Sequence, residues 1–185
     1  AIACAAQSVG ANVTLISGIT ALAPPRYCQF IQVETAQAMH RAVFEHINQC
    51  DIFIAAAAVA DYRPTDVAQQ KMKKNDDTLT LTLQKNADIL ADVAALPSPP
   101  FTVGFAAETH DLEHYARDKL TRKKLDMIAA NWVGGERGGF ESNENALDIF
   151  WQEGQKSLPM TDKEIVAAQL ISLIAERCKL KITPS

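Results

Sequence analysis

Residues 51–57 constrain the fold most, because the six residues that follow the aspartate, Ile-Phe-Ile-Ala-Ala-Ala, are all apolar. A strand that is apolar on both faces is typical of a parallel sheet that helices cover on each side. Residues 101–106 form a similar run, and residues 125–130 fit a further short strand. Residues 111–124, between these two strands, have the apolar spacing of an amphipathic helix. This alternation predicts an α/β fold with a mostly parallel sheet.

The rest of the chain fits the same alternation. A helix over residues 1–9 should end at Gly10, and Thr35 should cap the next helix. We expect Asn86 and Thr161 to cap two later helices. Residues 79–83 alternate Leu and Thr, which predicts a half-exposed antiparallel strand. We therefore predict one Rossmann-like, three-layer domain with a small antiparallel dimerisation or flap element, and with further strands over residues 12–16, 30–33 and 146–151.

Composition limits the class of protein and its partners. The 185 residues suit one domain, since domains typically span ~100–200 residues. The net charge of −4 gives no general basic field, so we expect no nucleic-acid partner. No apolar run approaches the roughly 20 residues of a membrane helix, so no membrane partner is expected. The four cysteines form no CxxC pair, which favours a reduced, cytoplasmic protein.

A metal site is not expected from the protein's own side chains. His110 and His114 are four residues apart, but Asp111 stands where the zincin motif requires Glu. No third ligand for this pair is evident in the sequence. We therefore predict no metal bound by protein ligands alone.

Parallel sheets bind ligands beyond the carboxyl ends of their strands, which directs attention to residues 57–63, 105–109 and 131 onward. The small side chains before and within the first of these segments would let a ligand approach the backbone. Three lysines within four residues, at 71, 73 and 74, could bind phosphate. Lys119 and Lys123 share one helix face and could do the same. Each group also has an ordinary structural explanation: a buried strand end, a solvated basic loop, or favourable charge at a helix C-terminus.

Several stretches together resemble phosphopantothenoylcysteine synthetase, the synthetase half of the bacterial bifunctional coenzyme A biosynthesis flavoprotein. The most specific are Ala-Ala-Ala-Val-Ala-Asp-Tyr-Arg at residues 56–63 and Val-Gly-Phe-Ala-Ala-Glu-Thr at residues 103–109. Between them stand Lys-Met-Lys-Lys at 71–74 and Lys-Asn-Ala-Asp-Ile-Leu at 85–90. The order and spacing continue through 115–119 and 147–151, so the resemblance covers essentially the whole chain.

The resemblance implies a ligase that joins 4′-phosphopantothenate to cysteine. CTP, with Mg²⁺, would activate the carboxylate as an acyl-cytidylate, and the cysteine amine would then displace CMP. It further implies a homodimer and fusion, in the complete protein, to a flavin-dependent decarboxylase. The implied catalytic residue is Lys71, on a flap. The implied nucleotide-binding residues are Ala55, Ala56, Ala57, Asp61, Lys71, Ala87, Asp88, Ile89, Leu90, Phe105, Lys119 and Lys123.

Within this resemblance the sequence departs from the family in places. Ala87 stands where the family usually has Pro, and Trp132 where it often has Asp. Residues 1–185 read as a single synthetase domain that lacks the family's N-terminal strand and phosphate-binding turn. Two other functions remain open: a nicotinamide-dependent oxidoreductase, for which Glu34 after a strand would be the acidic residue, and a non-catalytic nucleotide-binding module.

Overall fold

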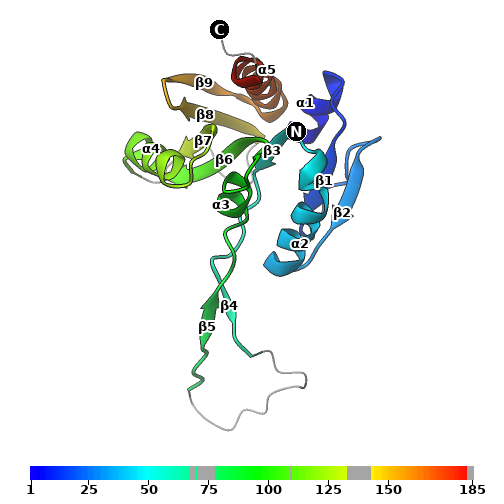
Figure 1. The fold of residues 1–185 in the computed structure, drawn as a ribbon, viewed down its shortest axis with the longest axis vertical. Helices are drawn as coiled ribbons and strands as arrows, with labels where there is room; N and C mark the ends of the chain where they lie inside the picture. Colours follow the sequence, from blue (N-terminus) through cyan, green and yellow to red (C-terminus); the bar gives the residue numbers. More distant parts are fainter. Residues whose placement is uncertain (67–69, 71–77, 109, 133–142, 183–185) are drawn as a thin grey trace.

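The computed structural model describes residues 1–66, 70, 78–108, 110–132 and 143–182, and its arrangement is shown in Figure 1. The elements follow one another in an alternation of helices and strands. In chain order they are α1 (Ile2–Ser8), β1 (Thr14–Ser17), β2 (Gln29–Gln32), α2 (Ala36–His46), the 3-10 helix η1 (Ile47–Gln49), β3 (Ile52–Ala55), β4 (Tyr62–Pro64), β5 (Leu83–Lys85), α3 (Ile89–Ala94), β6 (Phe101–Glu108), α4 (Leu112–Arg122), β7 (Met127–Trp132), β8 (Glu144–Trp151), β9 (Gly154–Asp162) and α5 (Lys163–Ile182).

The central sheet has five strands in the order β3-β6-β7-β8-β9. β3, β6 and β7 are parallel neighbours, and β8 and β9 add two antiparallel pairs. A separate two-stranded sheet pairs β1 with β2 in parallel. Three of these five pairings are therefore parallel, which confirms the predicted α/β fold with a mostly parallel sheet.

Helices cover both faces of the central sheet, as three-layer packing requires. One apolar cluster lies between the sheet and α1 and α5, and includes Val103, Met127 and Ile149 from the strands and Leu170 and Ile174 from α5. A second cluster lies on the opposite face, where Leu112, Ala116 and Leu120 of α4 and Leu90 of α3 pack. A third joins α2, η1 and α3. The predicted three layers are confirmed.

Strand β9 was not expected, and it changes where the last helix begins. Thr161 was predicted to cap that helix, but it lies in β9 and pairs with Asn145 of β8. Asp162 caps the helix instead, because its Oδ1 accepts a hydrogen bond from the Glu164 N–H at 2.7 Å. The sequence signal for β9 is weak because Leu158 is its one buried apolar side chain and Pro159 interrupts it. Pro is tolerated there since β9 is an edge strand.

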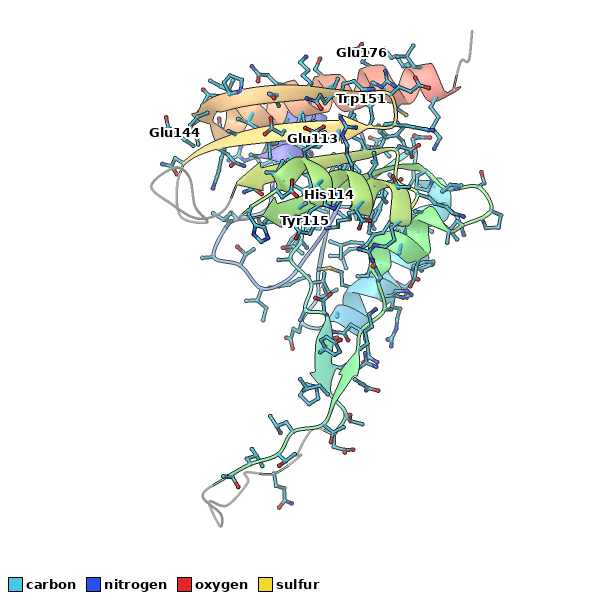
Figure 2. The ribbon with its side chains drawn as sticks, turned by 90° about the vertical axis from the view of Figure 1, so that its left-hand side faces the viewer. Glu113, His114, Tyr115, Glu144, Trp151 and Glu176 are labelled. Carbon is cyan, nitrogen blue, oxygen red and sulfur yellow. The ribbon has the colours of Figure 1, made fainter. Side chains whose placement is uncertain are left out.

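The β8–β9 turn requires a glycine because an aromatic ring packs onto it. A Cβ on Gly154 would stand 2.8 Å from Cζ2 of Trp151. The Trp151 ring also lies beside α5 (Figure 2), where the Arg177 guanidinium lies over the ring, 4.9 Å from its centroid. The indole thus contacts both the turn and the helix.

Strands β4 and β5 form an antiparallel hairpin that projects away from the rest of the chain (Figure 1). The predicted strand over residues 79–83 is therefore correct in its antiparallel pairing but misplaced, because only Leu83 of that segment lies in β5. Leu79 and Leu81 are more than half exposed, so their alternation does not mark a face packed against this chain.

In the described part of the chain, no helix is long and apolar enough to cross a membrane.

Candidate functional site

Several of the predicted site residues meet near the carboxyl end of β3 and at α3 and α4, which pack on one face of β6. Ala55 ends β3 and pairs with Gly104 of β6. Ala55 also packs in the same apolar cluster as Leu90 of α3. A Cβ on Gly104 would lie 2.8 Å from Cδ2 of Leu90 and 3.0 Å from Cδ1 of Leu125, so the glycine lets α3 approach the sheet closely.

Asp88 caps α3 and forms an ion pair with a lysine of α4. Its Oδ1 accepts a hydrogen bond from the Ala91 N–H at 3.1 Å. Its Oδ2 lies 2.5 Å from Nζ of Lys123, whose side chain is only 15% exposed. The capping residue is therefore Asp88 and not Asn86, because a cap oxygen must reach an N–H in the first helical turn. This pair joins the start of α3 to the end of α4.

The electrostatics of Asp88 follow from these contacts. Partial burial alone would raise the pKa of its carboxyl group, because burial disfavours the charged form. The hydrogen bonds from Lys123 and the Ala91 N–H, together with the charges of Lys123 and Lys119, outweigh that effect and lower the pKa below the ordinary value of 3.8. The carboxylate is therefore ionised at neutral pH and holds both lysines by their charge.

Lys119 reaches from α4 to the sheet. Its Nζ donates a hydrogen bond to the Phe105 carbonyl oxygen at 2.8 Å. Lys119 and Lys123 thus turn their ammonium groups toward β6 and the start of α3, as expected from their four-residue spacing. Two cations and one carboxylate come together where α4 faces the start of α3.

The lowered pKa of Asp88 predicts a pH-dependent contribution to stability. The contribution should be fully present above the ordinary pKa of 3.8 and be lost as the pH falls through the lower folded-state value. Asp88→Asn cannot titrate, so the difference in unfolding free energy between native and variant should shrink on acidification from about pH 6 to about pH 3. Urea unfolding across this range measures it.

The matched control for this experiment is Asp118→Asn. Asp118 pairs with Arg122 at 3.5 Å on the surface of α4, with both side chains more than half exposed. Exposed pairs contribute little, about 0–1 kcal/mol, so this variant should track the native protein at every pH. A pH-independent difference for Asp88→Asn, equal to that of the control, would contradict the prediction.

The remaining predicted site residues lie in different parts of the structure. The Phe105 ring packs partly buried against the cluster beneath α1 and α5, on the face opposite Lys119 and Lys123. Asp61 is exposed after β3, and its carbonyl oxygen accepts from the Asn86 N–H at 2.8 Å. Three alanines of the set, Ala56, Ala57 and Ala87, are also exposed, whereas Ile89 and Leu90 of α3 are buried. Lys71 lies outside the described residues.

Sequence reasoning missed a polar cross-link at the base of the β4–β5 hairpin. Asn86 is buried, and its side chain joins Arg63 to the Ala60 carbonyl. The sequence analysis named Asn86 as the cap, but Asp88, two residues later, has the same propensity for that position. Only the tertiary contacts assign the cap to Asp88 and the cross-link to Asn86.

The described residues contain no evident metal site. Among them, no group of three or more His, Cys, Asp or Glu side chains is placed to hold a metal ion. His114 lies on α4 beside Tyr115 (Figure 2), and the rings of His110 and His114 both make edge contacts with Tyr115, at 5.4 and 5.6 Å between centroids. Instead of converging on a common point, the two imidazoles pack around one phenol.

Comparison with known proteins identifies relatives of the whole chain. The coenzyme A biosynthesis bifunctional protein CoaBC of Vibrio cholerae is 54% identical over 180 residues, which cover 96% of this chain and 45% of the relative. The protein of the same name in Escherichia coli K12 is 49% identical over 96% of this chain and 45% of its own length. In Bacillus subtilis the identity is 42%, over 97% of this chain and 45% of the relative. The chain therefore spans less than half the length of these relatives.

Solved structures show the same fold. The crystal structure of the C-terminal domain of a coenzyme A biosynthesis bifunctional protein CoaBC superposes with a TM-score of 0.80 and 34% identity, covering 98% of this chain and 81% of that one. A Cab2 mutant, solved in complex with phosphopantothenate-cysteine, superposes with a TM-score of 0.65 over 85% of this chain and 56% of that one. Its identity is 15%, so it supports the fold alone.

The family comparison covers nearly the entire sequence. Residues 1–178 match the family described as the DNA/pantothenate metabolism flavoprotein C-terminal domain. This match, together with the relatives above, confirms the resemblance seen in the sequence motifs. The chain belongs to the DNA/pantothenate metabolism flavoprotein C-terminal domain family.

Proposed function

We propose that the full-length protein containing this chain ligates 4′-phosphopantothenate to cysteine, with CTP as the activating nucleotide. The observation that carries the proposal is the meeting of Lys119, Lys123 and Asp88 where α4 faces the start of α3. The family resemblance assigns the nucleotide to this region. The names of the relatives support a role in coenzyme A biosynthesis.

The proposed chemistry needs two transfers. A carboxylate oxygen of phosphopantothenate attacks the α-phosphorus of CTP, the bond to the β-phosphate oxygen breaks, and pyrophosphate leaves. The cysteine amine then attacks the acyl carbon of the acyl-cytidylate, the bond to the CMP oxygen breaks, and the amine loses a proton. The first step places additional negative charge on the departing pyrophosphate. Fixed cations stabilise such developing charge more than they stabilise the ground state.

Lys119 and Lys123 are suited to this task because their positions are fixed before the nucleotide arrives. Lys119 is held by the Phe105 carbonyl and Lys123 by the Asp88 carboxylate. A lysine that is already oriented loses less conformational entropy when it meets a phosphate than a free surface lysine does. The main chain of residues 87–90 begins beside this pair, and we propose that it contacts the base, as the resemblance implies. Lys71, outside the described residues, is the proposed catalytic cation.

Magnesium fits this donor set as a companion of the nucleotide. Mg²⁺ keeps several waters and binds through one or two carboxylates together with substrate phosphates. The described residues provide no cluster of three ligands, but Asp61 is an exposed carboxylate after β3 that could contribute to such a shared site. When bound, the ion would neutralise charge on the triphosphate.

The test is formation of the intermediate by the full-length protein. With labelled CTP, Mg²⁺ and phosphopantothenate but no cysteine, we expect pyrophosphate release and accumulation of the acyl-cytidylate. Added cysteine should then convert the intermediate to product and CMP. CTP binding without intermediate would favour a non-catalytic binding module. NADPH binding with no CTP binding would favour an oxidoreductase.

We further propose that the β4–β5 hairpin mediates a homodimer. Tyr62 and Leu83 of the hairpin, and Leu79 and Leu81 just before β5, are exposed apolar side chains, each more than half accessible. An exposed edge with apolar side chains readily pairs with another chain, so a second copy would cover these residues.

Leu81→Glu is therefore expected to convert a dimer of residues 1–185 into a monomer at micromolar concentration, because an interface that buries a new charge is strongly disfavoured. Light scattering measures the mass. Ile165→Glu is the control, since Ile165 is a half-exposed apolar residue on α5, away from the hairpin. A native chain that is already monomeric would refute the proposed dimer.

A further inference from the structure

Asn86 connects the two chain segments that leave and re-enter the candidate site around the hairpin. One segment leads from the end of β3 into β4, and the other leads from β5 into α3. The Asn86 N–H donates to the Asp61 carbonyl at 2.8 Å, and its side-chain Nδ2 donates to the Ala60 carbonyl at 2.8 Å. Its Oδ1 accepts from Nη1 of Arg63 at 2.6 Å. Asn86 is 8% exposed, so these bonds form away from most of the solvent.

Arg63 extends this cross-link along the hairpin. Its Nη1 also lies 3.4 Å from the Lys85 carbonyl oxygen. The Gln84 amide, oriented with its oxygen toward Arg63, accepts from Nη2 at 3.2 Å and Nε at 3.1 Å. The planar guanidinium therefore donates hydrogen bonds to three consecutive residues, 84–86, in a geometry that a lysine cannot reproduce. We call Arg63 and Asn86 together the clamp.

The clamp lies directly before the residues proposed to contact the nucleotide. Asn86 is followed by Ala87 and by Asp88, which caps α3 and holds Lys123. Tying Asn86 to Ala60 and Asp61 fixes the start of residues 87–90 relative to the connection that follows β3. A main-chain group that contacts a base cannot compensate for a displaced backbone by changing a rotamer. Displacements matter at this scale, because misplacing reacting groups by about 1 Å can lower a rate by about 10²-fold.

We propose that Arg63 and Asn86 are positioning residues that set the main chain of residues 87–90 for recognition of the nucleotide base. This inference rests on the proposed function, since it names what supports the same site. The clamp lies at the base side of the site. Lys119 has an anchor outside the clamped segment, the Phe105 carbonyl of β6, whereas Lys123 is held by Asp88 of residues 87–90. Loss of the clamp should therefore weaken contacts to the base more than contacts to phosphates.

The experiment measures ligand affinity in the full-length protein, with Mg²⁺ present, for CTP and for inorganic tripolyphosphate. Asn86→Ala should raise the Kd for CTP about tenfold, the loss of binding expected when buried hydrogen-bonding groups lose their partner. Arg63→Lys, which keeps the charge and removes the fork, should raise it about threefold or more. Both variants should raise the Kd for tripolyphosphate by clearly less than the Kd for CTP, because Lys119 keeps its anchor on the Phe105 carbonyl.

Thr65→Val is the matched control, because Thr65 Oγ1 donates to the Thr82 carbonyl at 3.2 Å further out on the same hairpin and does not contact the clamp. Its CTP affinity should equal that of the native protein. A merely structural role would reduce the active fraction and the melting temperature but leave the Kd for CTP unchanged. That result, or an equal loss of affinity for CTP and tripolyphosphate, would overturn the inference.

Different outcomes would contradict the proposed function and the positioning role of the clamp. If the native protein binds CTP and forms the acyl-cytidylate while both clamp variants bind CTP normally, the function stands and the inference is wrong. If the native protein binds no CTP, the proposed function fails and the inference fails with it. Should Asn86→Ala not fold, Arg63→Lys alone decides, because it preserves both the charge and most of the side-chain volume.

Discussion

Lys71→Gln is expected to slow formation of the acyl-cytidylate by about 10²–10³-fold. Glutamine keeps a polar side chain, one atom shorter than that of lysine, but removes its positive charge. Removing one preorganised group that stabilises transition-state charge typically lowers the rate by about 10²–10³-fold. The proposed role of Lys71 concerns charge that develops as pyrophosphate leaves, so the rate constant should fall much more than CTP affinity. Single-turnover formation of the labelled intermediate, with CTP and phosphopantothenate saturating, measures this effect.

Lys85→Gln is the matched control for Lys71→Gln. It makes the same chemical change at an exposed residue of β5 whose main-chain carbonyl accepts a hydrogen bond from Arg63. The control should form the intermediate at the native rate. If Lys71→Gln also forms it at the native rate, the essential cation lies elsewhere, with Lys119 and Lys123 the first to test. Equal losses of rate in both variants would indicate that total positive charge matters and that no single lysine is essential.

The parts of the fold predicted from sequence are those that burial dictates. Residues 51–57 and 101–106 are apolar on both faces, and both contain strands of the central sheet covered by helices. Thr35 caps α2 as expected, with its Oγ1 accepting from the Ala38 N–H at 3.0 Å. These features depend on local sequence and on the hydrophobic effect, which a single chain reveals.

The features that sequence could not predict depend on contacts between distant segments. Asn86 bonds to Arg63 and to Ala60, 23 and 26 residues away, and no local pattern distinguishes this role from that of a helix cap. Lys119 reaches the Phe105 carbonyl 14 residues away, although its helical spacing showed only that it shares a face with Lys123. The family motifs brought attention to these residues, but only the fold shows which partner each one has.

The Gly104 position joins the core to the site. In β6 its backbone packs against Leu90 of α3 and Leu125, which are 7% and 8% exposed. Gly104→Ala should lower the unfolding free energy by about 1–3 kcal/mol, because a methyl group added to a well-packed core forces its neighbours to move. Gly104→Val adds two further methyl groups and should cost about 3 kcal/mol or more by the same argument. The shift in urea midpoint, at constant slope, measures both changes.

Gly18→Ala is the control that separates crowding from the loss of glycine itself. A Cβ at Gly18 would have the Val33 carbonyl oxygen as its nearest neighbour, at 4.0 Å, so the methyl group has space there. This variant should stay within about 0.5 kcal/mol of native, or gain slightly through the restricted unfolded chain. Equal stability of Gly104→Ala and Gly18→Ala would show that Leu90 and Leu125 yield without cost. If Gly104→Ala displaces Leu90 as expected, it also moves residues 87–90. The folded variant should therefore bind CTP more weakly than native, whereas Gly18→Ala should bind it normally.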